Sequence, residues 1–209
     1  MRILLADDHA MLRGGLKLML TEAFKEATFG EAENCQQALE AAISQPWALI
    51  ILDISMPGRG GLDVLKEIRA QRVTTPILML SMYAERQFAV RAFRAGASGY
   101  LTKASAGTEL IRAVERILAG GRYVSTVLAE QLAAVLGDHG SDLLHERLSN
   151  REFEILRLIG SGKTVKEIAA ELALSSNTVS TYRTRILEKM NLHTNAELTH
   201  YAISHSLIE

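Results

Sequence analysis

The sequence of 209 residues is long enough for one large domain or two small ones. Its hydrophobic content of 48% and charged content of 22% are typical of a folded globular protein and exclude a disordered chain. No apolar run approaches the ~20 residues of a membrane helix, and the single cysteine excludes an internal disulfide framework. We therefore expect a cytoplasmic protein that does not enter the membrane. The net charge of −1 means that any nucleic-acid binding must rest on a local motif.

Short apolar runs alternate with helical patterns through the first part of the chain. The apolar runs predict strands at 2–6, 28–32, 48–52, 77–80 and 98–101. Stretches with apolar residues three and four positions apart predict helices at 11–22, 36–44, 62–70, 85–95 and 106–119. Because the connections are short, these βα repeats predict an α/β fold. We expect a doubly wound parallel sheet with helices on both faces.

The character of the sequence changes after Gly120, where two successive glycines end the last of these helices. A short helix at about 125–136 is predicted next, followed by a polar segment at 137–147. Beyond Leu148 only helical patterns remain. We therefore predict three parts: a front domain at 1–122, a short helix with a linker at 123–147, and a small all-α domain at 148–209.

Reactive side chains follow several of the predicted strands at their carboxyl ends. Asp7 and Asp8 end the first strand, Asp53 ends the third, Ser81 the fourth, and Lys103 follows the fifth. In a doubly wound sheet, ligands bind at this edge. Carboxylates placed so close together repel one another unless a cation joins them, which favours Mg²⁺. In such a site Asp53 is the nucleophile toward a phosphoryl group, whose oxygens Ser81 and Lys103 can bind.

The paired acids, the motif D-x-x-M-P-G at 53–58, Ser81 and Lys103 resemble the receiver domain of two-component response regulators. The resemblance covers about residues 1–120 and implies a sheet of strand order 2-1-3-4-5. It implies that Asp53 accepts a phosphoryl group from a sensor histidine kinase. It also implies that the protein is no enzyme beyond this self-directed transfer and a slow autodephosphorylation.

The same resemblance implies roles for the neighbouring residues. The implied Mg²⁺ ligands are Asp8, Asp53 and the backbone carbonyl of Ser55, with Asp7 as a supporting acid, and the implied switch pair is Ser81 and Tyr100. The Ser81 hydroxyl would move toward the phosphoryl group while the aromatic ring turns inward. One departure is Ala104, where many receivers have a proline, and it removes no reactive group. For His9 we expect only a surface position in the first helical turn.

Three alternatives to a receiver fit the sequence less well. The stretch GSGKT at 160–164 looks like the end of a P-loop, but Arg157 stands where the motif needs glycine and a helical pattern precedes it. The stretch GRGGLD at 58–63 lacks the third glycine of the dinucleotide-binding pattern. A phosphohydrolase with Asp53 as nucleophile would typically carry a second acid at position 55, which is a serine. That reading also leaves the C-terminal part unexplained.

The C-terminal part contains two helix starts with the same signature. Ser149 and Thr164 are each followed by glutamate three residues later, as in a capping box. A turn at 174–177 then leads into a third helix at 177–190. Two helices joined by so short a turn indicate a helix-turn-helix, whose second helix enters the DNA major groove. From residue 178 onward this helix carries three basic side chains against one acidic one, a net charge of +2. A plain helical bundle is the alternative.

The segment from LSNRE at 148–152 to the end of the third helix resembles the LuxR-type effector domain of NarL/FixJ-class response regulators, over about residues 146–209. The resemblance implies a homodimer on promoter DNA, paired through the last helix at 196–206, with RNA polymerase as a further partner. The implied base-facing residues are Ser180, Thr181 and Thr184, and the candidates for backbone contacts are Thr178, Tyr182, Arg183, Arg185 and Lys189. Many members carry lysines at 180 and 184, so the target sequence does not carry over. We predict a phosphorylation-controlled transcription regulator; a module that binds only protein is the remaining alternative.

Overall fold

The computed structural model describes residues 1–56, 60–82, 85–125, 129, 143–205 and 207–208. The chain divides into two compact units, Met1–Asp138 and His139–Glu209, which we call the front unit and the rear unit. The division falls within the segment predicted to be the linker. None of the helices in the described ranges combines the length with the apolar composition that a bilayer crossing requires.

The front unit is built on a five-stranded parallel sheet of order β2-β1-β3-β4-β5, as the sequence predicted. The strands are β1 (Arg2–Ala6), β2 (Thr28–Ala32), β3 (Leu49–Asp53), β4 (Ile77–Ser81) and β5 (Gly99–Thr102). Every residue of β3 and β4 is buried, because helices cover both faces of the sheet. The prediction of a doubly wound α/β fold is therefore confirmed.

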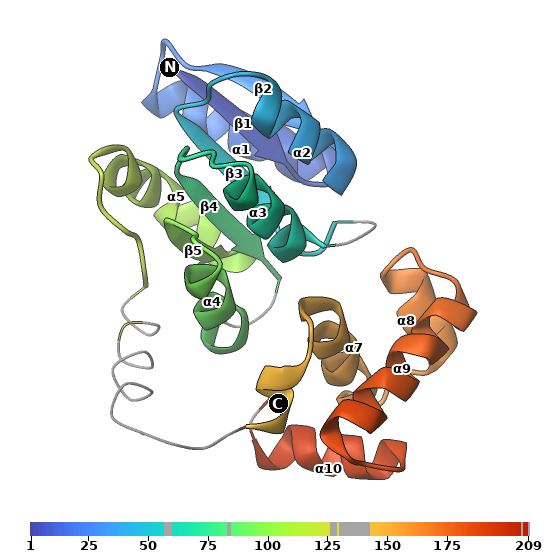
Figure 1. The fold of residues 1–209 in the computed structure, drawn as a ribbon. Helices are drawn as coiled ribbons and strands as arrows, with labels where there is room; N and C mark the ends of the chain where they lie inside the picture. Colours follow the sequence, from blue (N-terminus) through green and yellow to red (C-terminus); the bar gives the residue numbers. More distant parts are fainter. Residues whose placement is uncertain (57–59, 83–84, 126–128, 130–142, 206, 209) are drawn as a thin grey trace. The chain divides into compact units, whose positions relative to one another are not determined.

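The helices of the front unit are α1 (Ala10–Ala23), α2 (Cys35–Ser44), α3 (Gly61–Ala70), α4 (Glu85–Arg94) and α5 (Lys103–Leu118). Helices α1 and α5 cover one face, where Leu16 and Leu110 join a core with alternate strand residues such as Ile3 and Leu5. Helices α2, α3 and α4 lie over the opposite face (Figure 1). The strand ends between these layers carry the predicted site.

Helix α5 begins at Lys103, three residues before the predicted start at 106. The reason is local, because the Thr102 hydroxyl accepts a hydrogen bond from the Ser105 N–H at 3.1 Å and caps the helix. Ala104, where many receivers have proline, is thus already helical. Lys103 is therefore the first residue of a capped helix and does not lie in a loop.

The segment that leaves α5 returns to the sheet. Tyr123 pairs in parallel with Gly99 of β5, and the Tyr123 N–H donates to the Ser98 carbonyl at 3.0 Å. Tyr123 is buried, so the start of the predicted 123–147 segment packs with the front unit. The short helix predicted at 125–136 falls almost wholly outside the described residues and remains a prediction.

The described part of the rear unit is helical. It contains the 3₁₀ turn η1 (Leu144–Arg147) and the helices α7 (Asn150–Gly160), α8 (Val165–Glu171), α9 (Ser176–Met190) and α10 (Asn195–Ser204). Capping boxes open α7 at Ser149 and α8 at Thr164, as the sequence predicted, and a third opens α10 at Thr194. Helix α9 buries Val179, Ile186 and Met190, which leaves its other side to solvent.

Candidate functional site

The acids of the front unit meet at the carboxyl edge of the sheet. Asp7 and Asp8 follow β1 directly, and Asp53 is the last residue of β3, the strand next to β1. One ligand atom from each of these three acids and from His9 lies within 4.8 Å of the others. Asp7 and Asp53 are buried, whereas Asp8 is partly exposed. The topology therefore brings together three acids that are separated by up to 46 positions in the sequence (53 − 7 = 46).

Lys103 lies between the two buried acids. Its Nζ is 2.7 Å from Asp7 Oδ2 and 2.8 Å from Asp53 Oδ2. Burial lowers the pKa of Lys103, but the two carboxylates outweigh this effect and raise the pKa above its ordinary value. The ammonium group is therefore charged and shared by two carboxylates.

Asp53 is the group whose protonation the site perturbs most clearly. Burial raises the pKa of Asp53 to about 6, the negative charge of Asp7 adds to this rise, and Lys103 opposes it. A hydrogen bond from the Ser55 backbone also opposes the rise. Only one oxygen of Asp53 reaches Lys103, and the other, Oδ1, is buried without a side-chain partner among the described residues. One ammonium thus leaves the charge of two buried acids incompletely balanced, which suits a further cation or an incoming electrophile.

The backbone behind Asp53 admits only glycine at position 61. A Cβ atom there would lie 1.9 Å from the carbonyl oxygen of Asp53. The Gly61 N–H also donates to the Ile54 carbonyl at 2.8 Å, which draws the start of α3 against the end of β3. Helix α3 thereby fixes the strand end that carries Asp53.

The other residues predicted for this site lie along the same edge. Ser81 ends β4 and is fully buried, with Thr102 as its partner in the register of β5. Tyr100, within β5, is also fully buried. Ser55 follows Asp53 by two residues and is partly exposed.

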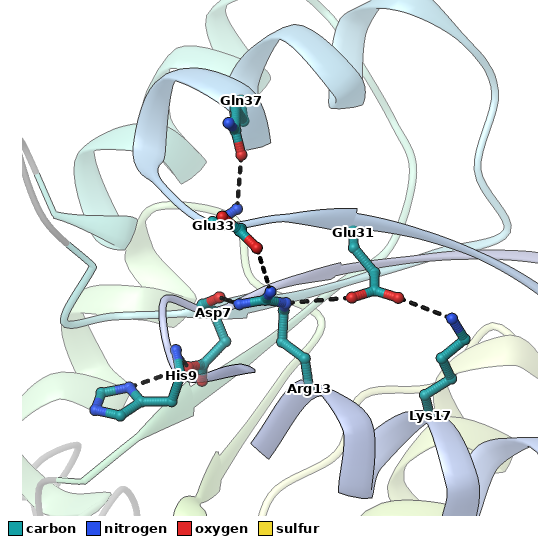
Figure 2. Close-up of polar contacts among 7 residues, drawn as sticks. All are labelled: Asp7, His9, Arg13, Lys17, Glu31, Glu33 and Gln37. Carbon is teal, nitrogen blue, oxygen red and sulfur yellow. Dashed lines mark hydrogen bonds and ion pairs between the residues drawn. The ribbon is translucent and has the colours of Figure 1, made fainter. Parts of the chain in front are cut away.

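Two residues that the sequence did not assign to the site contact it. The Nδ1 atom of His9 lies 2.8 Å from Asp8 Oδ1 and 3.2 Å from Asp7 Oδ1, although the His9 side chain is 66% exposed. Arg13 donates a hydrogen bond to the carbonyl oxygen of Asp7. Figure 2 shows both residues beside Asp7.

The exposed side of α9 carries the side chains predicted to face DNA. Ser180, Thr181, Thr184, Arg185 and Lys189 are exposed, and Thr178, Tyr182 and Arg183 are partly exposed. The hydroxyls of Thr181 and Thr184 donate to backbone carbonyls one turn earlier in the same helix. Among the described residues, the side chains of Ser180 and Arg185 have no hydrogen-bond or ion-pair partner.

Two of the basic side chains on α9 already have partners. Arg183 Nε donates to Asn195 Oδ1 at 2.5 Å, and Lys189 Nζ donates to Glu152 Oε2 at 2.7 Å. Burial raises the pKa of Glu152, but the ion pair with Lys189 and the Ser149 N–H outweigh burial and lower the pKa. Lys189 thus stabilises the start of α7, a role that the sequence did not suggest.

Comparisons with known proteins match both units. A model described as the response regulator receiver domain matches residues 3–115, and one described as bacterial regulatory proteins of the luxR family matches residues 146–202. The response regulator UvrY of Escherichia coli is 34% identical over 98% of this chain and 94% of its own. The chain belongs to the response regulators.

Two further comparisons extend over nearly the whole of this response regulator. The response regulator GacA of Pseudomonas protegens is 33% identical over 100% of this chain and 98% of its own. A solved structure of RcsB from Salmonella enterica serovar Typhimurium, bound to a promoter in the presence of phosphomimetic BeF₃⁻, has a TM-score of 0.60 and 25% identity. It covers 96% of this chain and 97% of the RcsB chain. The chain is thus a transcription regulator of a two-component system, controlled by phosphorylation, with a DNA-binding rear domain.

The P-loop alternative does not agree with the geometry of this response regulator. The stretch GSGKT follows a helix, because α7 runs to Gly160, and it ends at Thr164, the cap of α8. A P-loop instead joins a strand to a helix. The resemblance of these five letters to a nucleotide-binding motif is therefore accidental.

Proposed function

We propose that Asp53 is the phosphoryl acceptor of this response regulator. The observation that carries the proposal is the buried Asp53 carboxylate, which lies beside Lys103 and converges with the carboxylates of Asp7 and Asp8. A phosphohistidine of a sensor kinase is the proposed donor. An Asp53 oxygen forms a new P–O bond as the P–N bond breaks, and the imidazole nitrogen keeps the electron pair. Slow hydrolysis of the resulting acyl phosphate by water would restore the carboxylate.

We propose that Mg²⁺ assists this transfer. The cluster of three carboxylates fits a hard divalent ion, because the oxygen donors converge and one of them, Asp53 Oδ1, is buried without a side-chain partner among the described residues. The proposed ligands are Asp8, Asp53 and the Ser55 carbonyl, with Asp7 as the supporting acid. When bound, Mg²⁺ would shield the negative charge of the phosphoryl oxygens from that of the carboxylates.

Ser81 and Tyr100 are the proposed switch residues. The position of Ser81 at the end of β4, next to β3, supports a hydroxyl that donates to a phosphoryl oxygen on Asp53. Lys103 would bind a second phosphoryl oxygen once the added charge competes with Asp7 for its ammonium group. Tyr100 lies two residues before Thr102, which caps the helix that begins at Lys103. A change at the phosphoryl group can therefore reach Tyr100 through one short strand.

The acceptor is tested by replacing Asp53 with asparagine, which keeps the size of the side chain and removes the nucleophile. With Mg²⁺ and a small phosphodonor, the wild type should gain one phosphoryl group per chain by intact mass, and Asp53→Asn should gain none. Asp63→Asn, in the first turn of α3, is the control for loss of an aspartate nearby and should gain one. Phosphoryl uptake by Asp53→Asn would refute the assignment, and continuous phosphate release by the wild type would favour the phosphohydrolase.

The rear unit is proposed to bind promoter DNA as a homodimer through α9, with contacts to RNA polymerase. The promoter-bound structure of RcsB supports this proposal, as does Ile203, which is 60% exposed on α10 and suits a paired helix. Bases are proposed to contact Ser180, Thr181 and Thr184, and the DNA backbone to contact Thr178, Tyr182, Arg183, Arg185 and Lys189. Since the DNA lies in the cytoplasm of a bacterial cell, we place the protein there.

The DNA contact is tested at Arg185, because this exposed cation has no partner to lose within the described part of the chain. If Arg185 binds a phosphate, Arg185→Ala should weaken DNA binding by about tenfold and reduce the slope of log affinity against log salt by about 1. Arg122→Ala removes the same charge from an exposed position in the front unit and should change neither quantity. Unchanged affinity and slope in Arg185→Ala would show that α9 does not enter the groove as proposed.

A further inference from the structure

Arg13 is a buried arginine on the first turns of α1. Its side chain is 5% exposed and points into the loop between β1 and α1, as Figure 2 shows. The Nη1 group donates to the main-chain oxygen of Asp7 at 2.7 Å, and this contact is buried. Such a position is unusual for arginine, because burial of a guanidinium group is unfavourable unless its donors are satisfied.

The carbonyl that Arg13 holds belongs to the peptide that joins the paired acids. This peptide group links Asp7 to Asp8, so its orientation sets the direction in which Asp8 leaves the strand end. On its other side, the Asp7 N–H donates to the Ala32 carbonyl of β2 at 3.1 Å. The backbone of Asp7 is thus fixed by β2 on one side and by α1, through Arg13, on the other.

The side chain of Asp7 depends on the same fixed backbone. Its Oδ1 accepts a hydrogen bond from the His9 N–H at 2.8 Å, and its Oδ2 lies 2.7 Å from Lys103 Nζ. A rotation of the Asp7–Asp8 peptide would therefore move both carboxylates together. In the described part of the chain, Arg13 is the side chain that contacts the carbonyl of this peptide.

Two glutamates hold the guanidinium group of Arg13 from the side of β2. Arg13 Nη2 donates to Glu33 Oε1 at 2.6 Å, and Nε donates to Glu31 Oε2 at 3.4 Å. Lys17, one turn further along α1, binds the other oxygen of Glu31 at 2.8 Å. The Glu33 N–H donates to Gln37 of α2 at 2.9 Å (Figure 2). These contacts satisfy the donors of the buried guanidinium group and fix its orientation.

We propose that Arg13 is a positioning residue for the metal-binding acids: through the Asp7 carbonyl, it holds Asp7 and Asp8 in the arrangement that binds Mg²⁺. This inference rests on the proposed function of the acid cluster. Arg13 itself touches neither a carboxylate of the cluster nor the acceptor. Residues that orient metal ligands in this way typically change metal affinity by 10- to 100-fold when they are replaced.

The test is Mg²⁺ binding by the full-length protein, measured by isothermal titration calorimetry. Arg13→Met keeps the length of the side chain and removes its donors, and it should raise the Kd for Mg²⁺ by about tenfold. Arg13→Lys keeps one charged donor that can reach the carbonyl, so its Kd for Mg²⁺ should lie between those of the wild type and Arg13→Met. Lys17→Met is the matched control, because it removes a cation that contacts Glu31 but not Asp7, and its Kd should stay within about twofold of the wild type.

A second measurement separates positioning from a purely structural role. The rate of phosphoryl uptake from a small donor should require about tenfold more Mg²⁺ for half-saturation in Arg13→Met, yet reach nearly the wild-type rate at saturating Mg²⁺. If Arg13→Met fails to fold, Glu33→Gln is a milder variant for the same test, because it weakens the ion pair between Arg13 and the largely exposed Glu33. We expect Glu33→Gln to raise the Kd for Mg²⁺ about twofold to threefold.

The outcomes separate this inference from the proposal beneath it. If the wild type binds no Mg²⁺, the metal site and this role of Arg13 both fall. If the wild type binds Mg²⁺ while Arg13→Met and Glu33→Gln bind it equally well, the acid cluster stands and the role of Arg13 is refuted. A loss of the plateau rate at unchanged Mg²⁺ half-saturation would likewise overturn the role, because it would place Arg13 in the transfer step.

Discussion

Carboxylates are used in opposite ways in the two units. In the front unit, Asp7 and Asp53 are buried beside each other with one ammonium group between them. In the rear unit, Glu152 and its counterparts in the other two capping boxes accept hydrogen bonds from the N–H groups that open their helices. The first arrangement places two negative charges against one positive charge. In the second, each carboxylate accepts at least one hydrogen bond from the backbone.

The pKa of Asp53 and the pKa values of the capping-box glutamates shift in opposite directions for this reason. Burial and the charge of Asp7 raise the pKa of Asp53 to about 6, whereas the Lys189 and Ser149 contacts overcome burial and lower the pKa of Glu152. Hydrogen bonds from Thr164 likewise lower the pKa of Glu167. The capping-box glutamates of the rear unit thus have compensated charges in the folded state, whereas Asp7 and Asp53 of the front unit repel each other in a way that a bound cation can relieve.

The largest effect should come from removing the cation that the front acids share. Without divalent metal at pH 8, Lys103→Met should lower the free energy of unfolding of the front unit by about 3–5 kcal/mol, because it leaves two buried carboxylates without their shared cation. Lys163→Met removes the ion pair with Glu171, whose side chains are 39% and 40% exposed, and should cost less than about 1 kcal/mol.

The two units can be followed separately in this comparison. Trp47 is the only tryptophan and lies in the front unit, so its fluorescence during urea unfolding reports on Lys103→Met. Amide hydrogen exchange in α8 reports on Lys163→Met. Equal costs for the two substitutions would show that the front acids are no more strained than a surface pair.

A smaller effect should follow from replacing one carboxylate by an amide, with opposite signs in the two units. The folded pKa of Asp53 is about 6 and its ordinary value is 3.8. Between these values the folded chain retains a proton that the unfolded chain has released, so stability should fall as pH rises from about 4 to 6. The fall should approach about 3 kcal/mol without divalent metal. Asp53→Asn should abolish this fall and stabilise the front unit at neutral pH.

The matched change in the rear unit is Glu152→Gln. Because the pKa of Glu152 is lowered, its contribution is present above the ordinary value of 4.5 and is lost as pH falls through the folded pKa. Glu152→Gln should therefore destabilise the rear unit by about 1 kcal/mol at neutral pH and have little effect in acid. Hydrogen exchange of α7 across pH measures this, and a destabilising Asp53→Asn would contradict the contrast between the units.

The convergence of the front acids could be predicted from the sequence because a single geometric rule places them. Parallel strands end at one edge of a sheet, so Asp7 after β1 and Asp53 at the end of β3 had to meet. The rear unit was similarly predictable where signals are local, as at Ser149 and Thr164, whose partners lie three residues away.

Contacts that depend on the direction of a long side chain were not predictable in this way. Lys189 reaches Glu152 across 37 positions, and nothing in its own helix distinguishes it from a phosphate contact. Arg13 did carry a signal, since it occupies the buried stripe of α1 together with Leu16 and Leu20. A charged residue in an apolar stripe implies a buried partner, but the stripe does not say which.

The smallest effect concerns the turn that precedes α9, the helix that we propose to bind DNA. Ala173 adopts a left-handed conformation with φ of 51°, which is unfavourable for a residue with a Cβ. It does so because the helix ends in a Schellman motif, in which the Leu174 N–H donates to the Ala169 carbonyl at 2.8 Å. Ala173→Gly should therefore stabilise the rear unit by up to about 1 kcal/mol.

The control for this prediction is Ala170→Gly, an exposed position within α8, which should destabilise by about 0.5–1 kcal/mol. Both values come from hydrogen exchange of the α8 and α9 amides. If Ala173→Gly stabilises the rear unit while Ala170→Gly destabilises it, the hydrogen bonds of the turn hold Ala173 in a backbone conformation that alanine disfavours. Destabilisation by Ala173→Gly would mean instead that the alanine restricts the unfolded chain more than the left-handed turn strains the folded one.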